Sequence, residues 1–578
     1  MRREGTVRPP RAAALRRLLG ASIGVALVAT VSCSGPQASS SGSGREKADP
    51  AVLRAAESHP SSLLPLIVRE ASPRSNAAER LVEGLGGTVT HELPIIGAFS
   101  ARLPGEGVGR LLASPEVLKV WGDGRVHMSH GTDQYDSALP NKVWQKAIRL
   151  PDARALGYDG AGVTVAILDT GVFPVPDLAG RIKAVADFTP EGDGLDRYGH
   201  GTHMAGLIAG NGTSSGGAWS GVAPRAKVVS VKVAGVDGST DVSVVIAGLQ
   251  WVVANRSEFN IKILNLSFGT DSKQPYSIDP LDYAVEQVWS SGVLVVVAAG
   301  NGGSGAGTIN KPADDPYVVS VGAGDAKGTT DRSDDVVAPF SARGPTQDGV
   351  SKPDVAAPGI TLVSNRISGS TIDVQHLLAS LDQYYMKGTG TSQATAVVSG
   401  VAALLYDAVP NMTPNVAKAT LMGSAGDALA TQAGGGAGLV HAGRAVNQAL
   451  ASKYVGRPAN QNLTPSTGLG SLEASRGSFH VMVDQNGDGV AELLQGEFGF
   501  GWTAGSWSAG SWSGASWTAG SWSAGSWSAG SWSAGSWSAG SWSAGSWSAG
   551  SWSAGSWSAS SWTAGSWSAG SWSADAWA

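Results

Sequence analysis

The sequence lacks a second cysteine and any strongly basic run beyond its N-terminus. Cys33 is the only cysteine among 578 residues, so no intramolecular disulfide can form and core packing must hold the fold together. The 41 Lys and Arg residues and the 46 Asp and Glu residues give a net charge of −5. Nucleic-acid-binding proteins usually carry a basic patch, so we expect no nucleic-acid partner.

A long apolar run is also missing. The apolar segment near the N-terminus, residues 18–31, is shorter than the roughly 20 residues that span a bilayer. Six arginines precede it within the first 17 residues, an order that is typical of an export signal. We therefore predict an export signal over residues 1–33 and a linker over residues 34–60.

Cys33 stands at the end of this signal. It follows a small residue and precedes a Ser/Gly-rich segment, which resembles the lipid-attachment site of bacterial lipoproteins. A cysteine beside an ordinary signal-cleavage site has the same appearance, and both interpretations stay open. Either one predicts a protein that is extracellular or at the cell surface, with lipid anchoring through Cys33 under the first.

Residues 63–121 show a compact pattern of strand-like and helical segments in the order β-α-β-β-α-β. This order predicts a small sheet with two helices on one face. About 60 residues can barely bury a core of their own. We therefore expect this unit to pack against the segment that follows it.

Strands alternate with helices from residue 160 onward. Uninterrupted Val- and Ile-rich runs occupy residues 163–168, 227–233, 261–268 and 292–299, with helical patterns between them. Such runs predict an α/β fold whose central parallel sheet is covered on both faces. Functional sites in these folds gather at the carboxyl ends of the strands.

Four polar residues stand at the ends of these elements. Asp169 and Asn301 follow apolar strands, while His200 and Ser392 stand where a glycine-containing loop becomes a helix. Nucleophilic acyl transfer uses these types: a hydroxyl, an imidazole base, a carboxylate that orients it and a donor for the oxyanion. A bland alternative is that Ser392 or Thr391 only caps a buried helix.

These segments resemble the subtilisin-like serine proteases, the subtilases or peptidase S8 family, over about residues 150–450. Four further motifs occur in the family's order: Gly221-Val222-Ala223-Pro224, Asn265-Leu266-Ser267-Phe268-Gly269, Phe340-Ser341-Ala342-Arg343-Gly344-Pro345 and Lys352-Pro353-Asp354-Val355-Ala356-Ala357-Pro358-Gly359. The resemblance implies a three-layer subtilisin-like α/β fold with a central mainly parallel sheet. It also implies that Asp169, His200 and Ser392 form a catalytic triad with Asn301 as oxyanion donor.

The same resemblance implies the substrate-binding residues. Ser267, Phe268 and Gly269 on one side and Ala299 and Gly300 on the other would flank the primary specificity pocket. The side chain that this pocket accepts does not follow from the sequence, because its depth depends on loop conformation.

Three nearby residues need separate interpretation. His203 is the rival base, but in the family the first histidine of His-Gly-Thr-His is catalytic and the second is packed. Gln393 and Ala396 stand where the family usually has methionine and proline. Proline in the first turn pre-sets a helix, so Ala396 predicts a slightly looser helix start with an intact nucleophile.

The resemblance also implies a propeptide of α+β type over residues 61–128. It would assist folding and then inhibit the enzyme by placing its C-terminal tail in the active site until it is cut. The cut is expected between Trp121 and Pro140, with residues 127–130 as a candidate zone. The catalytic domain would span residues 140–453.

Residues 454–500 are a transitional segment that contains an acidic loop. Asp484, Asp488 and Glu492 are spaced as in a calcium loop, but Gln495 stands where an EF-hand needs a bidentate carboxylate. A polar hairpin turn is the preferred interpretation. We therefore predict no cofactor; calcium lacks a complete motif.

Residues 501–578 form a low-complexity tail in which tryptophan recurs at every fifth position from Trp502 to Trp577. A period of five matches neither a helix nor a strand, and Gly and Ser favour an extended or dynamic chain. A repetitive β-structure is the alternative. The tryptophans are suited to stacking on cell-wall sugars. The alternative interpretation is a spacer without a ligand.

The sequence therefore predicts an exported subtilisin-like serine endopeptidase, made as a proenzyme, that acts on protein or peptide substrates. Its own propeptide would be its inhibitor, and association with the cell wall or the membrane surface would come from the tail or a lipid anchor. The alternative is a surface scaffold or adhesin with an inactive subtilase domain and wall-binding Trp repeats. The complete set of four catalytic residue types favours the enzyme.

Overall fold

The structure is a computed structural model that describes residues 44–73, 75–123, 125–127, 135, 138–471, 482–483, 492–493, 502–504 and 507–577. The predicted export signal, with Cys33, lies outside the described residues. Among the helices in the described ranges, none is long and apolar enough to cross a membrane.

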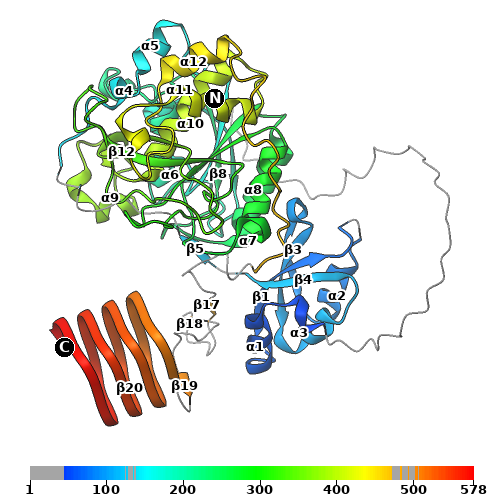
Figure 1. The fold of residues 1–578 in the computed structure, drawn as a ribbon. Coiled ribbons are helices and arrows are strands. Elements are labelled where there is room, and N and C mark those ends of the chain that lie inside the picture. The colour runs from blue at the N-terminus through cyan, green and yellow to red at the C-terminus, as the bar shows by residue number, and fades with distance from the viewer. Residues whose placement is uncertain are drawn as a thin grey trace. The chain divides into compact units, whose positions relative to one another are not determined.

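A central sheet of eight strands organises the larger part of the chain (Figure 1). Its order is β13-β12-β11-β10-β6-β8-β7, and β14 also pairs with β12. Every pairing is parallel except the antiparallel pair of β12 and β13. The strands are β6 (Thr164–Asp169), β7 (Ile182–Asp187), β8 (Lys227–Lys232), β10 (Ile261–Leu266), β11 (Leu294–Ala298), β12 (Val319–Asp325), β13 (Val336–Val337) and β14 (Val355–Pro358).

Helices pack against this sheet to complete the α/β fold that the sequence predicts. One pair, α7 (Val242–Asn255) and α8 (Pro280–Ser290), contacts β6, β10 and β11, and a second pair, α6 (His200–Ala209) and α10 (Thr391–Ala408), contacts β6, β10, β11 and β12. All residues of β6 and β11 are buried, as expected for parallel strands covered on both faces. Because β6, β10 and β11 are parallel neighbours, their carboxyl ends lie at the same edge of the sheet.

Shorter elements surround this core. They are α4 (Trp144–Ala147), α5 (Leu150–Ala155), β9 (Ser239–Asp241), β15 (Leu362–Asn365), α9 (Thr371–Gln375), β16 (Tyr385–Gly388), α11 (Pro414–Ser424) and α12 (Ala442–Leu450), with 3-10 turns at Pro176–Leu178, Thr213–Ser215, Tyr276–Ile278, Leu377–Ala379 and Ala428–Thr431.

The N-terminal part of the chain forms a separate antiparallel sheet of order β2-β3-β1-β4. Its elements run in the order that the sequence pattern predicts: β1 (Leu63–Glu70), α2 (Ala77–Gly84), β2 (Thr88–Leu93), the 3-10 turn Pro94–Ile96, β3 (Ala98–Pro104), α3 (Gly105–Leu112) and β4 (Val117–Gly122). We call residues 45–122 the N-terminal domain.

The two faces of this small sheet join different cores. Leu66 and Val68 of β1 pack into the domain's own apolar cluster, whereas Ile67 of the same strand and Trp121 of β4 join the large cluster of the central fold. The domain contacts α7 and α8 through β2 and the turn at 94–96. It therefore packs against the following segment, as its small size leads one to expect.

The predicted linker over residues 34–60 is corrected in its second half. A 3-10 turn (Arg45–Lys47) and helix α1 (Pro50–Ser58) occupy residues 45–58. Val52 and Ala55 of α1 are buried in the core of the N-terminal domain. Their apolar side chains give this helix a buried face that the overall composition of the segment did not reveal.

The C-terminal segments contain only β-structure in the described residues after 471. Strand β17 (Met482–Val483) pairs antiparallel with β18 (Glu492–Leu493), which agrees with a hairpin, while its loop with Asp484 and Asp488 lies outside the described residues. Beyond it, β19 (Trp502–Ala504) pairs in parallel with β20 (Trp507–Trp577).

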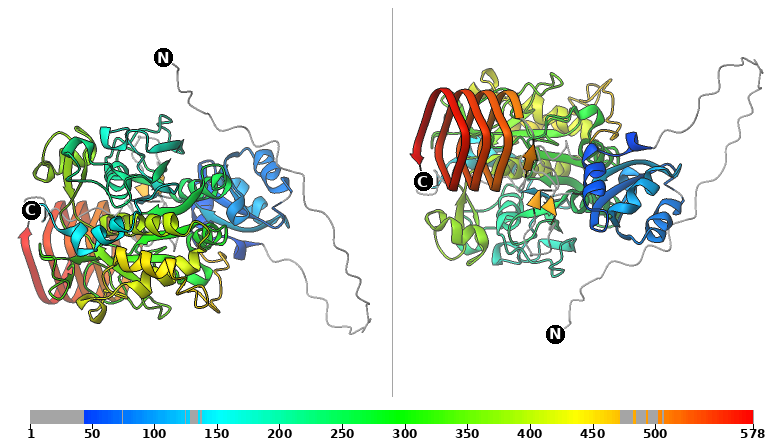
Figure 2. Two further views of the ribbon diagram at one scale, coloured as in Figure 1. Left: turned by 90° about the horizontal axis from the view of Figure 1, so that it is seen from above. Right: turned by 90° about the horizontal axis from the view of Figure 1, so that it is seen from below.

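The register of the tail is set by its repeat. Trp502 pairs with Trp522 and Ala504 with Ala524, so paired residues are 20 positions, or four pentapeptides, apart. Figures 1 and 2 show β20 as a ribbon that turns back on itself in stacked passes. The tail thus adopts the repetitive β-structure and not the extended or dynamic chain that its composition favoured.

Candidate active site

The carboxyl end of β6 brings Asp169 and His200 together. Asp169 is the last residue of β6 and is fully buried, and His200 is the first residue of α6. His200 Nδ1 lies 2.8 Å from Asp169 Oδ1 and 3.0 Å from Oδ2. A carboxylate in this position fixes the ring orientation and favours the tautomer with the proton on Nδ1.

Glycines on both sides of His200 permit this close approach. Gly199 has φ of 104°, and a Cβ there would lie 2.6 Å from Ser370 Oγ. A Cβ on Gly201 would lie 2.1 Å from the carbonyl oxygen of Gly171. Larger residues would therefore push the histidine away from β6.

Asp196 and Thr170 support the pair and were not identified from the sequence. The Asp196 carboxylate accepts hydrogen bonds from Gly199 N–H at 2.7 Å and from the backbone and hydroxyl of Thr202 at 2.8 and 2.7 Å. Thr170 donates its N–H to Asp169 Oδ1 at 2.8 Å and its hydroxyl to Asp196 at 2.9 Å. An aspartate four residues before a histidine is too common a pattern to have predicted this role.

The two histidines of α6 have opposite electrostatic environments. Burial lowers the pKa of His200, but the charge of Asp169 and its hydrogen bond outweigh burial, so the pKa lies above its usual value. Burial, with a contribution from His200, lowers the pKa of His203 to about 3. His203 is therefore a neutral packed residue, as the resemblance implies, and only His200 has a carboxylate partner for a base role.

Ser392 is the second residue of the buried helix α10. Its Oγ donates to the carbonyl oxygen of Ser267 at 3.1 Å and caps no helix N–H group. His200 Nε2 is buried and has no hydrogen-bond partner among the described residues. The capping alternative for Ser392 is thus not observed, and its hydroxyl and the histidine are not hydrogen-bonded to each other.

Asn301 lies beside the start of α10. Its Oδ1 accepts hydrogen bonds from Thr391 N–H at 2.9 Å and from Thr391 Oγ1 at 3.0 Å. A Cβ on Gly390 would lie 3.3 Å from Asn301 Nδ2, so the amide nitrogen faces the first residues of the helix. The first N–H groups of a helix have no intrahelical acceptor and favour negative charge, which makes this corner suited to an oxyanion.

The predicted pocket residues follow two neighbouring strands. Ser267, Phe268 and Gly269 come after β10, and Ala299 and Gly300 come after β11, its parallel neighbour. Their positions therefore place both segments at the edge that carries Ser392.

Both of these segments require a glycine. A Cβ on Gly269 would lie 2.5 Å from the carbonyl oxygen of Lys311, and one on Gly300, where φ is 111°, would lie 2.6 Å from Asn310 Cγ. The segment that contains Asn310 and Lys311 thus approaches both Gly269 and Gly300 closely.

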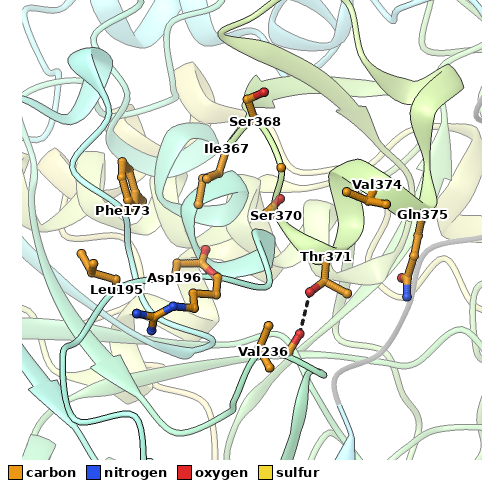
Figure 3. Close-up of a pocket in the computed structure, with 12 residues that line it drawn as sticks. Phe173, Leu195, Asp196, Val236, Ile367, Ser368, Ser370, Thr371, Val374 and Gln375 are labelled. Carbon is orange, nitrogen blue, oxygen red and sulfur yellow. Dashed lines mark hydrogen bonds between the residues drawn. The ribbon is translucent and has the colours of Figure 1, made fainter.

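A hollow of about 530 Å³ lies beside the loop that carries His200 (Figure 3). Phe173, Leu195 and Val236 form part of its lining, and Ile367 and Val374 come from the segment around α9. Backbone bonds from Thr371 to Arg197 at 3.0 Å and from Ile372 to Tyr198 at 3.0 Å join that segment to the loop. Sequence reasoning did not predict this hollow, because segments far apart in the sequence form it.

The two departures from the family motif lie in α10. Ala396 is the sixth residue of the helix, beyond the first turn, so the predicted loosening through a missing first-turn proline does not apply. Gln393 is buried, and its Oε1 has no hydrogen-bond partner in the described structure. This position therefore carries an unsatisfied acceptor next to Ser392.

No group of three or more His, Cys, Asp or Glu side chains in the described ranges is arranged to hold a metal ion.

Comparison with known proteins adds to this geometry. Residues 160–459 match the model of the Subtilase family. Serine protease AprX of Bacillus subtilis (strain 168) is 41% identical over 268 residues, which are 45% of this chain and 61% of that protease, less than two thirds of its length. M-protease of Shouchella clausii (strain KSM-K16) is 36% identical over 322 residues, 56% of this chain and 72% of that protease. Subtilisin E of Bacillus subtilis (strain 168) is 32% identical over 348 residues, 59% of this chain and 79% of that protein.

Proposed function

Because the chain belongs to the subtilase family of subtilisin-like serine proteases, we propose that it is an exported serine endopeptidase made as a proenzyme. The observation that carries this proposal is the pair of Asp169 and His200 at 2.8 Å, with Nε2 of the imidazole left without a partner in the described residues. A general base needs one ring nitrogen open for the proton that it takes.

Ser392 is assigned as the nucleophile. Its side chain rotates from the carbonyl of Ser267 toward Nε2 of His200, which takes the hydroxyl proton as Oγ bonds to the carbonyl carbon of the substrate. Asp169 stabilises the imidazolium that forms. The substrate oxygen becomes negative and accepts hydrogen bonds from the N–H of Ser392 and the amide of Asn301.

The remaining steps use the same groups. Collapse of the tetrahedral intermediate breaks the C–N bond, and His200 gives its proton to the leaving amine while the acyl group stays on Ser392. Water then loses a proton to His200 as it attacks the acyl carbon. A second collapse releases the acid and returns the proton to the serine.

The peptide side chain before the scissile bond would enter the pocket flanked by Ser267, Phe268 and Gly269 and by Ala299 and Gly300. The support is their place after β10 and β11, at the same edge of the sheet as Ser392. Protein or peptide substrates are therefore proposed, without a preferred side chain.

The inhibitor role is proposed for residues 61–128. Strand β5 (Arg125–His127) pairs antiparallel with β9, with Val126 opposite Thr240. Addition of a strand to an exposed edge is a common way to bind a peptide. Asp123, just before β5, accepts hydrogen bonds from the N–H and hydroxyl of Ser243 at the start of α7. Cleavage is proposed between Trp121 and Pro140, with residues 127–130 as the candidate zone; of that zone, residues 128–130 lie outside the described residues.

Location and attachment follow from the sequence. Export is proposed from the signal over residues 1–33, lipid anchoring from Cys33, and cell-wall association from the repeated tryptophans of the tail.

Labelling with a fluorophosphonate probe tests the catalytic proposal. The processed wild-type protein should be labelled, and Ser392→Ala should not be. Absence of labelling in correctly processed wild type, or equal labelling of Ser392→Ala, would reject the proposed protease function. The surface scaffold or adhesin would then be the remaining hypothesis.

A further inference from the structure

A segment after the last helix of the central fold lies between that fold and the N-terminal domain. We call residues 463–471 the strap. On one side its backbone bonds to the central fold: Thr467 N–H donates to Ser277 O at 2.8 Å, and Gly470 N–H donates to Ile278 O at 2.6 Å. Ser466 N–H donates to the Glu286 carboxylate of α8 at 2.9 and 3.0 Å.

The other side of the strap receives hydrogen bonds from the N-terminal domain. Arg69 of β1 donates to the carbonyl oxygens of Thr467 and Gly468 at 3.0 and 2.8 Å. Trp121 of β4 donates its indole N–H to Gly470 O at 2.7 Å. The hydroxyl of Ser471 donates to Asp49 at 2.9 Å.

Glycines allow the strap to pass through this narrow space. Gly468 has φ of 59°, and a Cβ there would lie 2.9 Å from the Tyr283 ring of α8. A Cβ on Gly470 would lie 2.7 Å from Gln274 Oε1 and from Ile278 O. The guanidinium of Arg69 sits 5.3 Å from the centre of the Tyr283 ring. The strap is therefore closely packed between the central fold and the N-terminal domain.

We propose that the strap retains the N-terminal domain after the chain between that domain and the central fold is cut. The inference rests on the proposed proenzyme and adds a second surface that binds the N-terminal domain. The strap supplies carbonyl acceptors that α7 and α8 do not supply. Removal of the domain would in turn leave the strap without these donors, so departure of the inhibitor and loosening of the chain that leads to the tail are coupled.

The burial of Trp121 gives the retention its strength. Its side chain is fully buried, and an indole N–H is a donor with no alternative role. A buried donor that loses its only acceptor carries the full cost of desolvation. By thermodynamic reciprocity, whatever the strap contributes to holding the domain, the domain contributes equally to holding the strap.

The test uses the full chain with Ser392→Ala and a recognition site for an added protease inserted within residues 128–134. After cleavage, the rate at which the N-terminal fragment leaves is followed by size-exclusion chromatography. Trp121→Phe, which removes one buried hydrogen bond, and Arg69→Met, which removes two charge-assisted hydrogen bonds, should each speed its release at least about three- to tenfold.

Matched controls separate the strap from general destabilisation. Trp289→Phe removes an indole hydrogen bond to Asn415 inside the central fold, and Arg45→Met removes an exposed ion pair within the N-terminal domain. Both should release the fragment within about twofold of the parent rate, because neither of these two interactions involves the strap.

Two truncations give an independent measurement. A chain that ends after residue 462 lacks the strap and should release the fragment faster than a chain that ends after residue 500, which keeps it. Equal release from both truncations, or release from Trp121→Phe and Arg69→Met at the rate of the controls, would overturn the retention role. Because the serine is absent throughout, failure here is distinct from failure of the fluorophosphonate test, which concerns catalysis alone.

Discussion

At the scale of single residues, the hydroxyl of Ser392 donates to Ser267 while Nε2 of His200 has no partner in the described structure. In the proposed mechanism, a catalytic cycle therefore begins with rotation of the Ser392 side chain about χ1. Its equilibrium sets the fraction of enzyme that is poised to react.

The pH dependence of activity should report the environment of His200. Because Asp169 raises the pKa of His200 above its usual value, the imidazole stays protonated, and unable to accept the serine proton, to a higher pH than a free histidine. The acid limb of kcat/KM should therefore have its midpoint above about 6.5. A pH series with a peptide substrate measures it.

Asp169→Asn provides the comparison for this profile, since it removes the charge that raises the pKa. Its midpoint should move to lower pH, and its activity should fall by several orders of magnitude. A wild-type midpoint at or below 6 would contradict the assignment of His200 and Asp169 as the pair.

Asn301→Ala should lower kcat by roughly a hundred- to a thousandfold with a small change in KM. That range comes from the same kind of substitution in a subtilisin and is applied by analogy. The reason is the loss of one oxyanion donor at the start of α10. Steady-state kinetics with a peptide substrate gives both constants.

Thr391→Val separates this effect from local structure. Asn301 also accepts two hydrogen bonds from Thr391. The valine removes the one from the hydroxyl, together with the hydrogen bond that this hydroxyl accepts from Gly300 N–H, while leaving the asparagine in place. Its loss of kcat should be much smaller. Equal losses in the two variants would show that Asn301 acts through structure and not as a donor.

At the scale of elements, α10 carries both the nucleophile and a position that is not optimal for stability. Gln393→Met should raise the free energy of unfolding by about 1 kcal/mol, because the buried Oε1 of Gln393 has no partner in the described residues and an apolar side chain of similar length removes that cost. Thermal unfolding should show a rise in Tm of about 1–3 °C, with peptide hydrolysis within about twofold.

The control for this substitution is Gln432→Met. Gln432 accepts a hydrogen bond from Val337 N–H and donates to Asp335 O, so the same change there should lower Tm. If Gln393→Met is destabilising to the same degree, the glutamine makes a contribution that its hydrogen bonds do not explain.

The sequence predicted those elements whose signal is local. The strand that ends at Asp169 and the helix that starts at His200 were predicted because apolar runs meet glycines there. The hollow beside α9 was not predicted, because Ile367 and Val374 meet Phe173 and Val236 only in the folded chain.

The strap and the hydrogen bonds of Asp196 were not predicted for the same reason. Both consist of polar contacts between segments far apart in sequence, and neither has a periodic pattern. Helix α1 was missed for a different reason: a short amphipathic helix was masked by the composition of the predicted linker around it.

At the scale of the whole molecule, deletion of residues 501–578 should leave hydrolysis of a small peptide within about twofold. None of the candidate catalytic or pocket residues lies in the tail, and the strap precedes it. The deletion should reduce retention of the protein on cell-wall preparations, because regularly spaced indole rings suit stacking on sugars. Sedimentation with purified walls measures bound and free protein.

Full-length Ser392→Ala is the matched control for wall retention. It should be retained as well as wild type, since retention by the tail does not depend on proteolysis. Equal retention of the deleted and complete chains would count against a wall-binding tail.

The register of the tail also bears on how its length can change over generations. Paired residues are 20 positions apart, so each group of four pentapeptides adds one pass, and neighbouring parallel strands lie about 4.8 Å apart. Each pentapeptide is encoded by a whole number of codons, so gain or loss of whole repeat units in the gene would leave the reading frame unchanged. The length of the tail can thus change in small, uniform steps while the sequence of the central fold stays unchanged.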